Sequence, residues 1–259
     1  MTHSMRLVWT CMLALALSLS CAGQVRSSKV HSSRKASAST ARVPFVGCES
    51  DGQQGFLTAP KGQSKTLPLS AKAAQRLAFY QAANGFGVLA PKGWYCFGTY
   101  GSNGESLFVS QKPFNSSDLF AKDWSGFDGP AIQVSSEYGD TSGRFGVAKT
   151  IARVFPAYKE FVQDVIAERI APAGSFPSGP YAADKLTYRG ERTVEFQTAA
   201  DSDGLGTQSR LKKGNAPIAG ITMLVGDTPD LLQLSMRLTP DTNDLGPVIV
   251  QQFERQSKR

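Results

Sequence analysis

The most strongly patterned segment of the chain is IAGITMLVGDTPDLLQLSMRL, residues 218–238. Apolar side chains recur at every second position in both halves, and the turn-forming sequence GDTP at residues 226–229 separates them. Alternation with a period of two is typical of β-strands, and strands this apolar belong in the interior of a sheet. The segment therefore predicts a hairpin at the centre of a β-sheet.

Strand and helix patterns on both sides of this hairpin complete the predicted fold. Further strands are expected at residues 86–90, 93–100, 105–110, 131–135, 185–189 and 193–197. Helices are expected from Ser70 to Asn84, from Ser142 to Phe155, over 161–170 and from Leu245 to Gln256. An Asn-Gly turn at 103–104 joins two strands, and Pro156 either separates the two middle helices or kinks a single one. The predicted fold class is α+β, an antiparallel sheet covered by helices.

Residues 1–22 have the pattern of a signal peptide. Arg6 precedes an apolar run at 7–19, which is shorter than the roughly 20 residues that a transmembrane helix needs. The sequence LSLSC at residues 17–21 resembles a bacterial lipobox, which implies a diacylglyceryl group on Cys21 and a membrane-anchored lipoprotein of the cell envelope. Ordinary cleavage next to Cys21 would instead release a soluble periplasmic or secreted protein.

Residues 23–42 are expected to form a disordered basic tether, and residues 43–259 a single domain. The tether is rich in Ser, Ala, Lys and Arg and has no aromatic residue, so it cannot bury a core. Six of the 28 Lys and Arg residues precede residue 43, which leaves the domain 22 basic residues against all 21 acidic ones. A nucleic-acid-binding domain normally carries a clear basic excess, so no nucleic-acid partner is expected.

The predicted domain contains two of the four cysteines, Cys48 and Cys96. A single pair in an oxidising envelope favours a disulfide. Two free thiols, one of them catalytic, are the alternative. That alternative lacks the neighbouring histidine that normally activates a thiolate.

The predicted domain has no histidine, because His3 and His31 both precede residue 43. It therefore lacks the most common general base and a frequent transition-metal ligand. Ser209-Arg-Leu-Lys212 has the spacing of a Ser-Lys dyad, and Asp201-Ser-Asp-Gly begins like a calcium loop without completing it. No glycine-rich loop fits a nucleotide. No metal site and no cofactor is expected.

Carboxylate chemistry without histidine stays open, as glycoside hydrolysis illustrates. The candidate acids are scattered through predicted turns and strands, and their spacing pairs none of them. They are Glu105, Glu137, Asp140, Glu195, Asp227 and Asp230.

Four aromatic residues in and beside one predicted strand form a candidate binding surface: Trp94, Tyr95, Phe97 and Tyr100. Alternate residues of a strand point to opposite faces, so Tyr95 and Phe97 share one face. One face must pack inward, and the other could present rings to a glycan or to a protein.

Two segments resemble parts of PsbP-like sandwich domains. The first is FGVLAPKGW at residues 86–94, and the second is LQLSMRLTP at residues 232–240 followed by a helix. The resemblance implies an antiparallel sheet between helices and non-enzymatic, accessory roles in exported compartments. The leading hypothesis is therefore a non-catalytic envelope protein that binds an envelope protein or a wall glycan. The alternative is a histidine-free cell-wall hydrolase that uses a carboxylate pair or Ser209 and Lys212.

Overall fold

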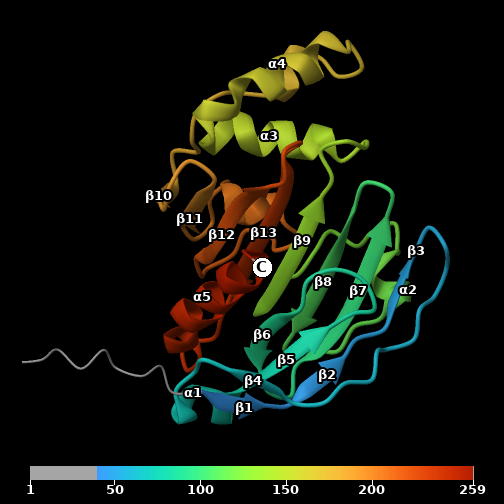
Figure 1. The fold of residues 1–259 in the computed structure, drawn as a ribbon, viewed down its shortest axis with the longest axis vertical. Helices are drawn as coiled ribbons and strands as arrows, with labels where there is room; N and C mark the ends of the chain where they lie inside the picture. Colours follow the sequence, from blue (N-terminus) through green and yellow to red (C-terminus); the bar gives the residue numbers. More distant parts are fainter. Residues whose placement is uncertain (1–39, 259) are drawn as a thin grey trace, which may run out of the picture. The chain divides into compact units, whose positions relative to one another are not determined.

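The computed structural model describes residues 40–258, which include five α-helices and a large sheet, so the fold is α+β. The predicted signal peptide, Cys21 and the predicted tether up to residue 39 lie outside the described residues. The large sheet has eight strands in the order β10-β11-β12-β13-β9-β8-β7-β3 (Figure 1). Their bounds are β3 Ser50–Gly52, β7 Tyr95–Gly101, β8 Gly104–Ser110, β9 Ala131–Glu137, β10 Asp184–Tyr188, β11 Thr193–Thr198, β12 Ile218–Val225 and β13 Asp230–Arg237.

The two predicted hairpins are present. β12 and β13 pair antiparallel and lie in the interior of the sheet, because β13 also pairs with β9. β7 and β8 pair across the Asn-Gly turn, where Gly104 has a φ of 147°. The prediction of an antiparallel sheet holds for seven strands, whereas the edge strand β3 runs parallel to β7.

A smaller sheet lies beside the large one and was not predicted (Figure 1). It consists of β2 (Phe45–Gly47), β5 (Leu77–Gln81) and β6 (Val88–Pro91), with β2 parallel to β5. A further pair joins β1 (Ala41–Val43) to β4 (Lys65–Leu67). The predicted tether is therefore too long by two residues, because Ala41 and Arg42 form ladder pairs with β4.

The predicted helix from Ser70 to Asn84 is wrong beyond its first turns. Ser70 does cap α1 (Ala71–Arg76), since its side chain accepts a hydrogen bond of 3.2 Å from the Ala73 N–H. The chain then becomes strand β5, in which Leu77, Phe79 and Tyr80 are buried. Pairing with β2 and β6 on both sides outweighs the helical propensity of this segment.

The remaining helices are α2 (Ser116–Leu119), α3 (Arg144–Val154), α4 (Lys159–Ala167) and α5 (Gly246–Ser257). α3 and α4 are separate, and a single 3₁₀ turn beginning at Pro156 lies between them. Ser142 does not cap α3, because the N-cap is Gly143 and no side-chain cap bond forms. Ile170 was expected on the inner face of the second helix, but α4 ends before it and its side chain is exposed.

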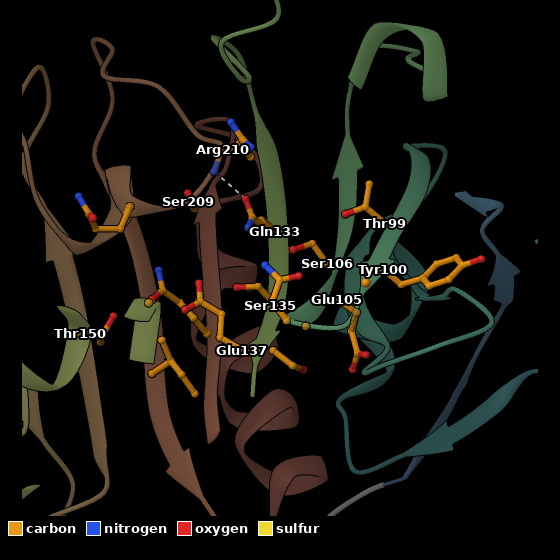
Figure 2. Close-up of a pocket in the computed structure, with 18 of the residues that line it drawn as sticks. Thr99, Tyr100, Glu105, Ser106, Gln133, Ser135, Glu137, Thr150, Ser209 and Arg210 are labelled. Atoms are coloured by element: carbon orange, nitrogen blue, oxygen red, sulfur yellow. Dashed lines mark hydrogen bonds between the residues drawn. The ribbon is translucent and has the colours of Figure 1, made fainter. Parts of the chain in front are cut away.

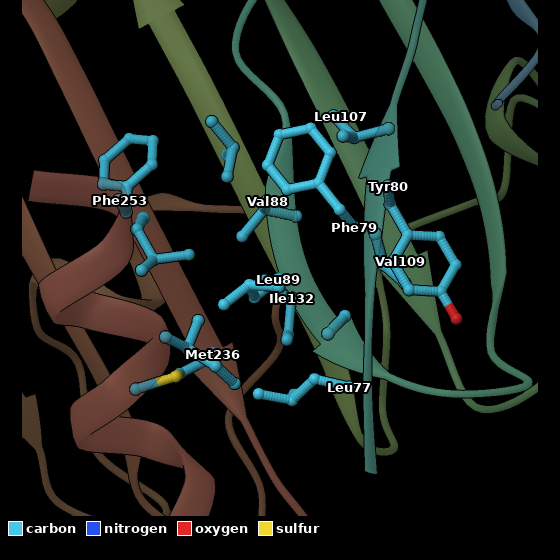
Figure 3. Packing of buried hydrophobic residues seen from close by; sticks show 14 of the residues in the cluster. Leu77, Phe79, Tyr80, Val88, Leu89, Leu107, Val109, Ile132, Met236 and Phe253 are labelled. Atoms are coloured by element: carbon cyan, nitrogen blue, oxygen red, sulfur yellow. The ribbon is translucent and has the colours of Figure 1, made fainter. Parts of the chain in front are cut away.

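The large sheet has two chemically different faces. On one, the apolar face, residues such as Leu107, Val109 and Ile132 form the main core with β5, β6 and α5 (Figure 3). On the other, the polar face, the alternating residues of β9 and β13 are Gln133, Ser135, Glu137, Gln233, Ser235 and Arg237. α3 and α4 form a second core with parts of β11, β12 and β13 on that side.

A disulfide joins Cys48 to Cys96 with an S–S distance of 2.03 Å, as predicted. It fixes the segment between β2 and β3 to β7 of the large sheet. Across residues 40–258, no helix has both the length and the apolar character that crossing a membrane requires.

Candidate functional site

A cavity of about 490 Å³ lies on the polar face and is the best-built candidate site (Figure 2). Its floor is one cross-strand row, in which Ser106 pairs with Thr99 on one side and with Ser135 on the other. Ser135 in turn pairs with Gln233 of β13. Small hydroxyl side chains fill little of the space above the sheet, so the row leaves a hollow. The volume lies within the range of roughly 300–1,000 Å³ that small-molecule sites occupy.

Two segments wall this hollow. The first is α3, from which Gly146, Lys149 and Thr150 reach the cavity. The second is the loop at 208–210, which contributes Gln208, Ser209 and Arg210. The lining is dominated by hydroxyl, amide and charged groups, which suits a polar ligand.

Arg237 holds the second wall in place from beneath. This residue is 3 % exposed, and its guanidinium donates to the carbonyls of Asp128, at 3.0 Å, and of Lys212. The loops carrying these residues are also joined directly, because the Phe127 N–H donates to the Arg210 carbonyl at 2.7 Å. Burial lowers the pKa of Arg237, but this pKa starts far above neutrality, so the group stays charged.

Two buried glutamines face the cavity with fixed amide orientations. Gln133 is 7 % exposed, and its Oε1 accepts a 2.6 Å hydrogen bond from the Arg210 N–H. Gln233 is 6 % exposed, and its Nε2 donates to the Leu205 carbonyl at 3.2 Å and to Ser235 Oγ at 3.0 Å. A backbone N–H can only donate and a carbonyl can only accept, so these contacts determine which amide atom is oxygen and which is nitrogen. Within residues 40–258, Gln133 Nε2 and Gln233 Oε1 have no hydrogen-bond partner.

Glu137 closes one end of the cavity beneath α3. Its Oε2 is buried and has no hydrogen-bond partner in the described part of the chain. A Cβ on Gly146 would lie 1.7 Å from this oxygen, so the glycine is what lets the helix approach the carboxylate. Burial raises the pKa of Glu137, and the opposing attraction of Lys149 is smaller.

The structure does not bring the proposed Ser-Lys dyad together. Ser209 Oγ donates to the Gly206 carbonyl at 2.6 Å and accepts from the Leu211 N–H at 3.1 Å. Lys212 Nζ lies 2.8 Å from a carboxylate oxygen of Asp128. Only Ser209 of the two lines the cavity.

Two of the candidate carboxylates, Glu105 and Glu137, line the cavity, but their side chains do not converge. Glu105 pairs with Ser136 and Glu137 with Gly104, so the two glutamates point to opposite faces of the sheet. Glu105 accepts a hydrogen bond from the Tyr138 hydroxyl. The pKa of Tyr138 is raised, mainly because the hydroxyl is buried and to a smaller extent because Glu105 accepts this hydrogen bond.

The other predicted acids lie elsewhere on the molecule. Glu195 forms a 2.6 Å ion pair with Arg189, and Asp230 accepts from the Gly139 N–H at 2.8 Å. Asp140 and Asp227 are exposed.

The four aromatic candidates do not form one surface. Phe97 is buried in a small cluster with Phe108 and Leu119, and Trp94 packs against the main core. Tyr100 lines the cavity, but its hydroxyl donates to the Gly55 carbonyl at 2.5 Å and its ring points away from Ser135 (Figure 2). Tyr95 is half exposed, so a binding role for its ring stays a prediction.

The acidic turn that begins like a calcium loop is held by a lysine. Asp203 forms a 2.7 Å ion pair with Lys213, and the Asp201 N–H donates to the Gly214 carbonyl. The part of the chain that the structure describes contains no group of three or more His, Cys, Asp or Glu residues placed to hold a metal ion.

The residues of the cavity floor were missed by the sequence analysis, although the sequence does contain a signal. In the segments 131–137 and 230–237, polar residues recur at every second position opposite the apolar ones. Polar side chains along interior strands are unusual, and they indicate either exposure or a lined cavity.

Comparison with known proteins finds no counterpart: no family model, no curated protein and no solved structure matches the chain. The resemblance of residues 86–94 and 232–240 to PsbP-like domains therefore stays a prediction.

Proposed function

We propose that this chain is an exported, non-catalytic protein of the cell envelope that holds a polar wall component in the cavity on its polar face. The single observation that carries the proposal is the chemistry of this cavity. Buried glutamines, a row of small hydroxyl groups and one partly buried carboxylate offer hydrogen-bond donors and acceptors. They offer little apolar surface. A wall glycan is the envelope component whose chemistry matches such a lining.

The alternative of a wall hydrolase has less support. A glycosidase needs two carboxylates about 5–9.5 Å apart across one bond, and the sheet places Glu105 and Glu137 on opposite faces. A Ser-Lys hydrolase needs the two side chains in hydrogen-bond reach, whereas each already contacts another group. A binding role requires neither arrangement.

An exported location agrees with the disulfide, because such bonds persist in oxidising compartments. We propose that a lipid on Cys21 anchors the protein and that the basic segment after it spaces the domain from the membrane. Mass spectrometry of the detergent-extracted protein tests this anchor. A diacylglyceryl adduct on Cys21 supports it, whereas an unmodified N-terminus at residue 23 supports a soluble exported protein.

Titration calorimetry with muropeptides from a lysozyme digest of peptidoglycan tests the binding function. We expect the oxidised protein to bind them and Ser135→Leu, which fills the middle of the floor, to weaken binding at least tenfold, which corresponds to about 1.4 kcal/mol. Thr187→Leu adds the same side chain on the exposed strand β10 and is the matched control. Equal binding by the wild type and by Ser135→Leu, or no binding by the wild type, would contradict the proposal.

A further inference from the structure

The two buried glutamines of the cavity form a complementary pair of unused hydrogen-bonding groups. Gln133 presents the N–H groups of Nε2, because its Oε1 is held by the Arg210 N–H. Gln233 presents Oε1, because its Nε2 is held by Leu205 and Ser235. One glutamine therefore offers only donors and the other only an acceptor.

The register of the sheet places these two glutamines next to each other on the polar face. Gln133 of β9 is opposite Ser235 of β13, so Gln233 is its diagonal neighbour on the same face. The Cβ atoms of such diagonal neighbours lie roughly 7–8 Å apart or somewhat less, which is within reach of long side chains. A secondary carboxamide carries an acceptor and a donor on separate atoms, and each can make a hydrogen bond of about 2.9 Å. Its carbonyl would accept from Gln133, and its N–H would donate to Gln233.

We propose that the cavity selects N-acetylated sugars by forming hydrogen bonds from Gln133 and Gln233 to the acetamido group. This inference rests on the proposed function and names its ligand class. Thr99, Ser106 and Ser135 supply hydroxyl groups for the hydroxyls of the sugar ring. A peptide also carries secondary amides, but its side chains would need apolar subsites. Leu231 is the sole aliphatic hydrophobic side chain that lines the cavity within the described residues.

The selectivity is measured with two tetrasaccharides that share a β-1,4-linked glucose backbone. Chitotetraose carries an acetamido group at each C2 position, and cellotetraose carries a hydroxyl there. We expect the oxidised protein to bind chitotetraose about tenfold more tightly, since the carboxamide offers an acceptor and a donor on separate atoms, one for each glutamine, whereas the hydroxyl offers both on a single oxygen. Equal dissociation constants would overturn the inference, and binding of muropeptides would still support the proposed function.

Two further probes separate other sources of selectivity. The fully de-N-acetylated tetrasaccharide carries ammonium groups, so binding as tight as that of chitotetraose would assign recognition to Glu137 and overturn the inference. The dipeptide N-acetyl-alanyl-alanine amide offers secondary amides without a sugar ring. Tighter binding of this peptide than of chitotetraose would likewise overturn the assignment to a sugar.

A variant of Gln133 tests the role of the donor. Gln133→Glu keeps an acceptor oxygen for the Arg210 N–H and replaces the two N–H groups that face the cavity. We expect the preference for chitotetraose to fall about five- to tenfold. Gln251→Glu adds the same charge at an exposed position of α5 and should keep the full preference. An unchanged preference in folded Gln133→Glu would overturn the inference. If that variant does not fold, the comparison of tetrasaccharides on the wild type still decides it.

Discussion

Glu137 is the residue through which pH should act on the fold. Burial raises the pKa of this carboxyl group. The folded state therefore binds the carboxyl proton more tightly than the unfolded chain, in which glutamates titrate at about 4.3. The stability that the protonated side chain contributes is therefore fully present below that pH and is lost as pH rises through the raised pKa. We expect Glu137→Gln to lose this dependence and to gain stability relative to the wild type between pH 4 and pH 8.

Urea unfolding at a series of pH values measures this difference. Glu191→Gln, on the exposed turn between β10 and β11, is the control and should follow the wild type at every pH. If the difference in the free energy of unfolding between Glu137→Gln and the wild type were the same at every pH, Glu137 would not be the source of the pH dependence.

Arg237 is the residue on which the wall at 208–210 depends. Its buried guanidinium donates to carbonyls of two loops, and hydrogen bonds to charged groups contribute about 1.5–3 kcal/mol each. We expect Arg237→Met to lower the free energy of unfolding by about 3 kcal/mol and to speed hydrogen exchange at the amides of Phe127 and Lys212. Arg255→Met, on the exposed side of α5, should change neither quantity. Hydrogen-exchange rates in Arg237→Met that match those of the wild type would show that these loops keep their structure without the arginine.

At the scale of the elements, the contact between α3 and β9 gives a prediction whose sign is unusual. Replacing glycine by alanine inside a helix normally stabilises it by about 1 kcal/mol. At Gly146 the new Cβ would meet Glu137 Oε2, so we expect Gly146→Ala to destabilise the fold by about 1–3 kcal/mol. In urea unfolding, Gly174→Ala should be tolerated, because open space surrounds that position. Adding Glu137→Ala should restore most of the loss, and a double variant no better than Gly146→Ala would contradict the proposed contact.

The elements also show which local patterns predict structure. The hairpins at 95–110 and 218–237 follow from alternation and turn residues, which are local properties. Strand β5 was predicted as helix, because its partners β2 and β6 are recognisable only once the chain has folded. The same applies to Gly146, whose helical position gives no indication that a carboxylate lies against it.

At the scale of the whole molecule, the disulfide should contribute much of the stability. Cys48 and Cys96 are 48 residues apart, and closing a loop of this length lowers the entropy of the unfolded chain by an amount worth about 4 kcal/mol. We expect reduction to lower the melting temperature markedly, as measured by calorimetry with and without reductant. The double variant Cys48→Ser with Cys96→Ser should unfold at the same lower temperature in both conditions, and an unchanged transition in the reduced wild type would contradict this account.

The site belongs to this largest scale, which explains why the sequence predicted so little of it. Its floor combines Thr99, Ser106 and Ser135 with Gln233 from a strand almost a hundred residues further along the chain. Alternation along a single strand shows which of its residues lie on the same face, but only the order of the strands places residues from different strands in one row. By contrast, the disulfide was predictable, because elimination left one pair of cysteines.

The central claim is that the cavity on the polar face is where this protein binds its ligand. ¹⁵N-edited NMR of the side-chain amides of Gln133 and Gln233, recorded on the oxidised protein during titration with muropeptides, tests it most directly. The account predicts that both side-chain amide signals shift and saturate together, while the amide of Gln251 on α5 stays in place. Saturable shifts confined to residues outside the cavity, with both glutamine signals unmoved, would contradict it.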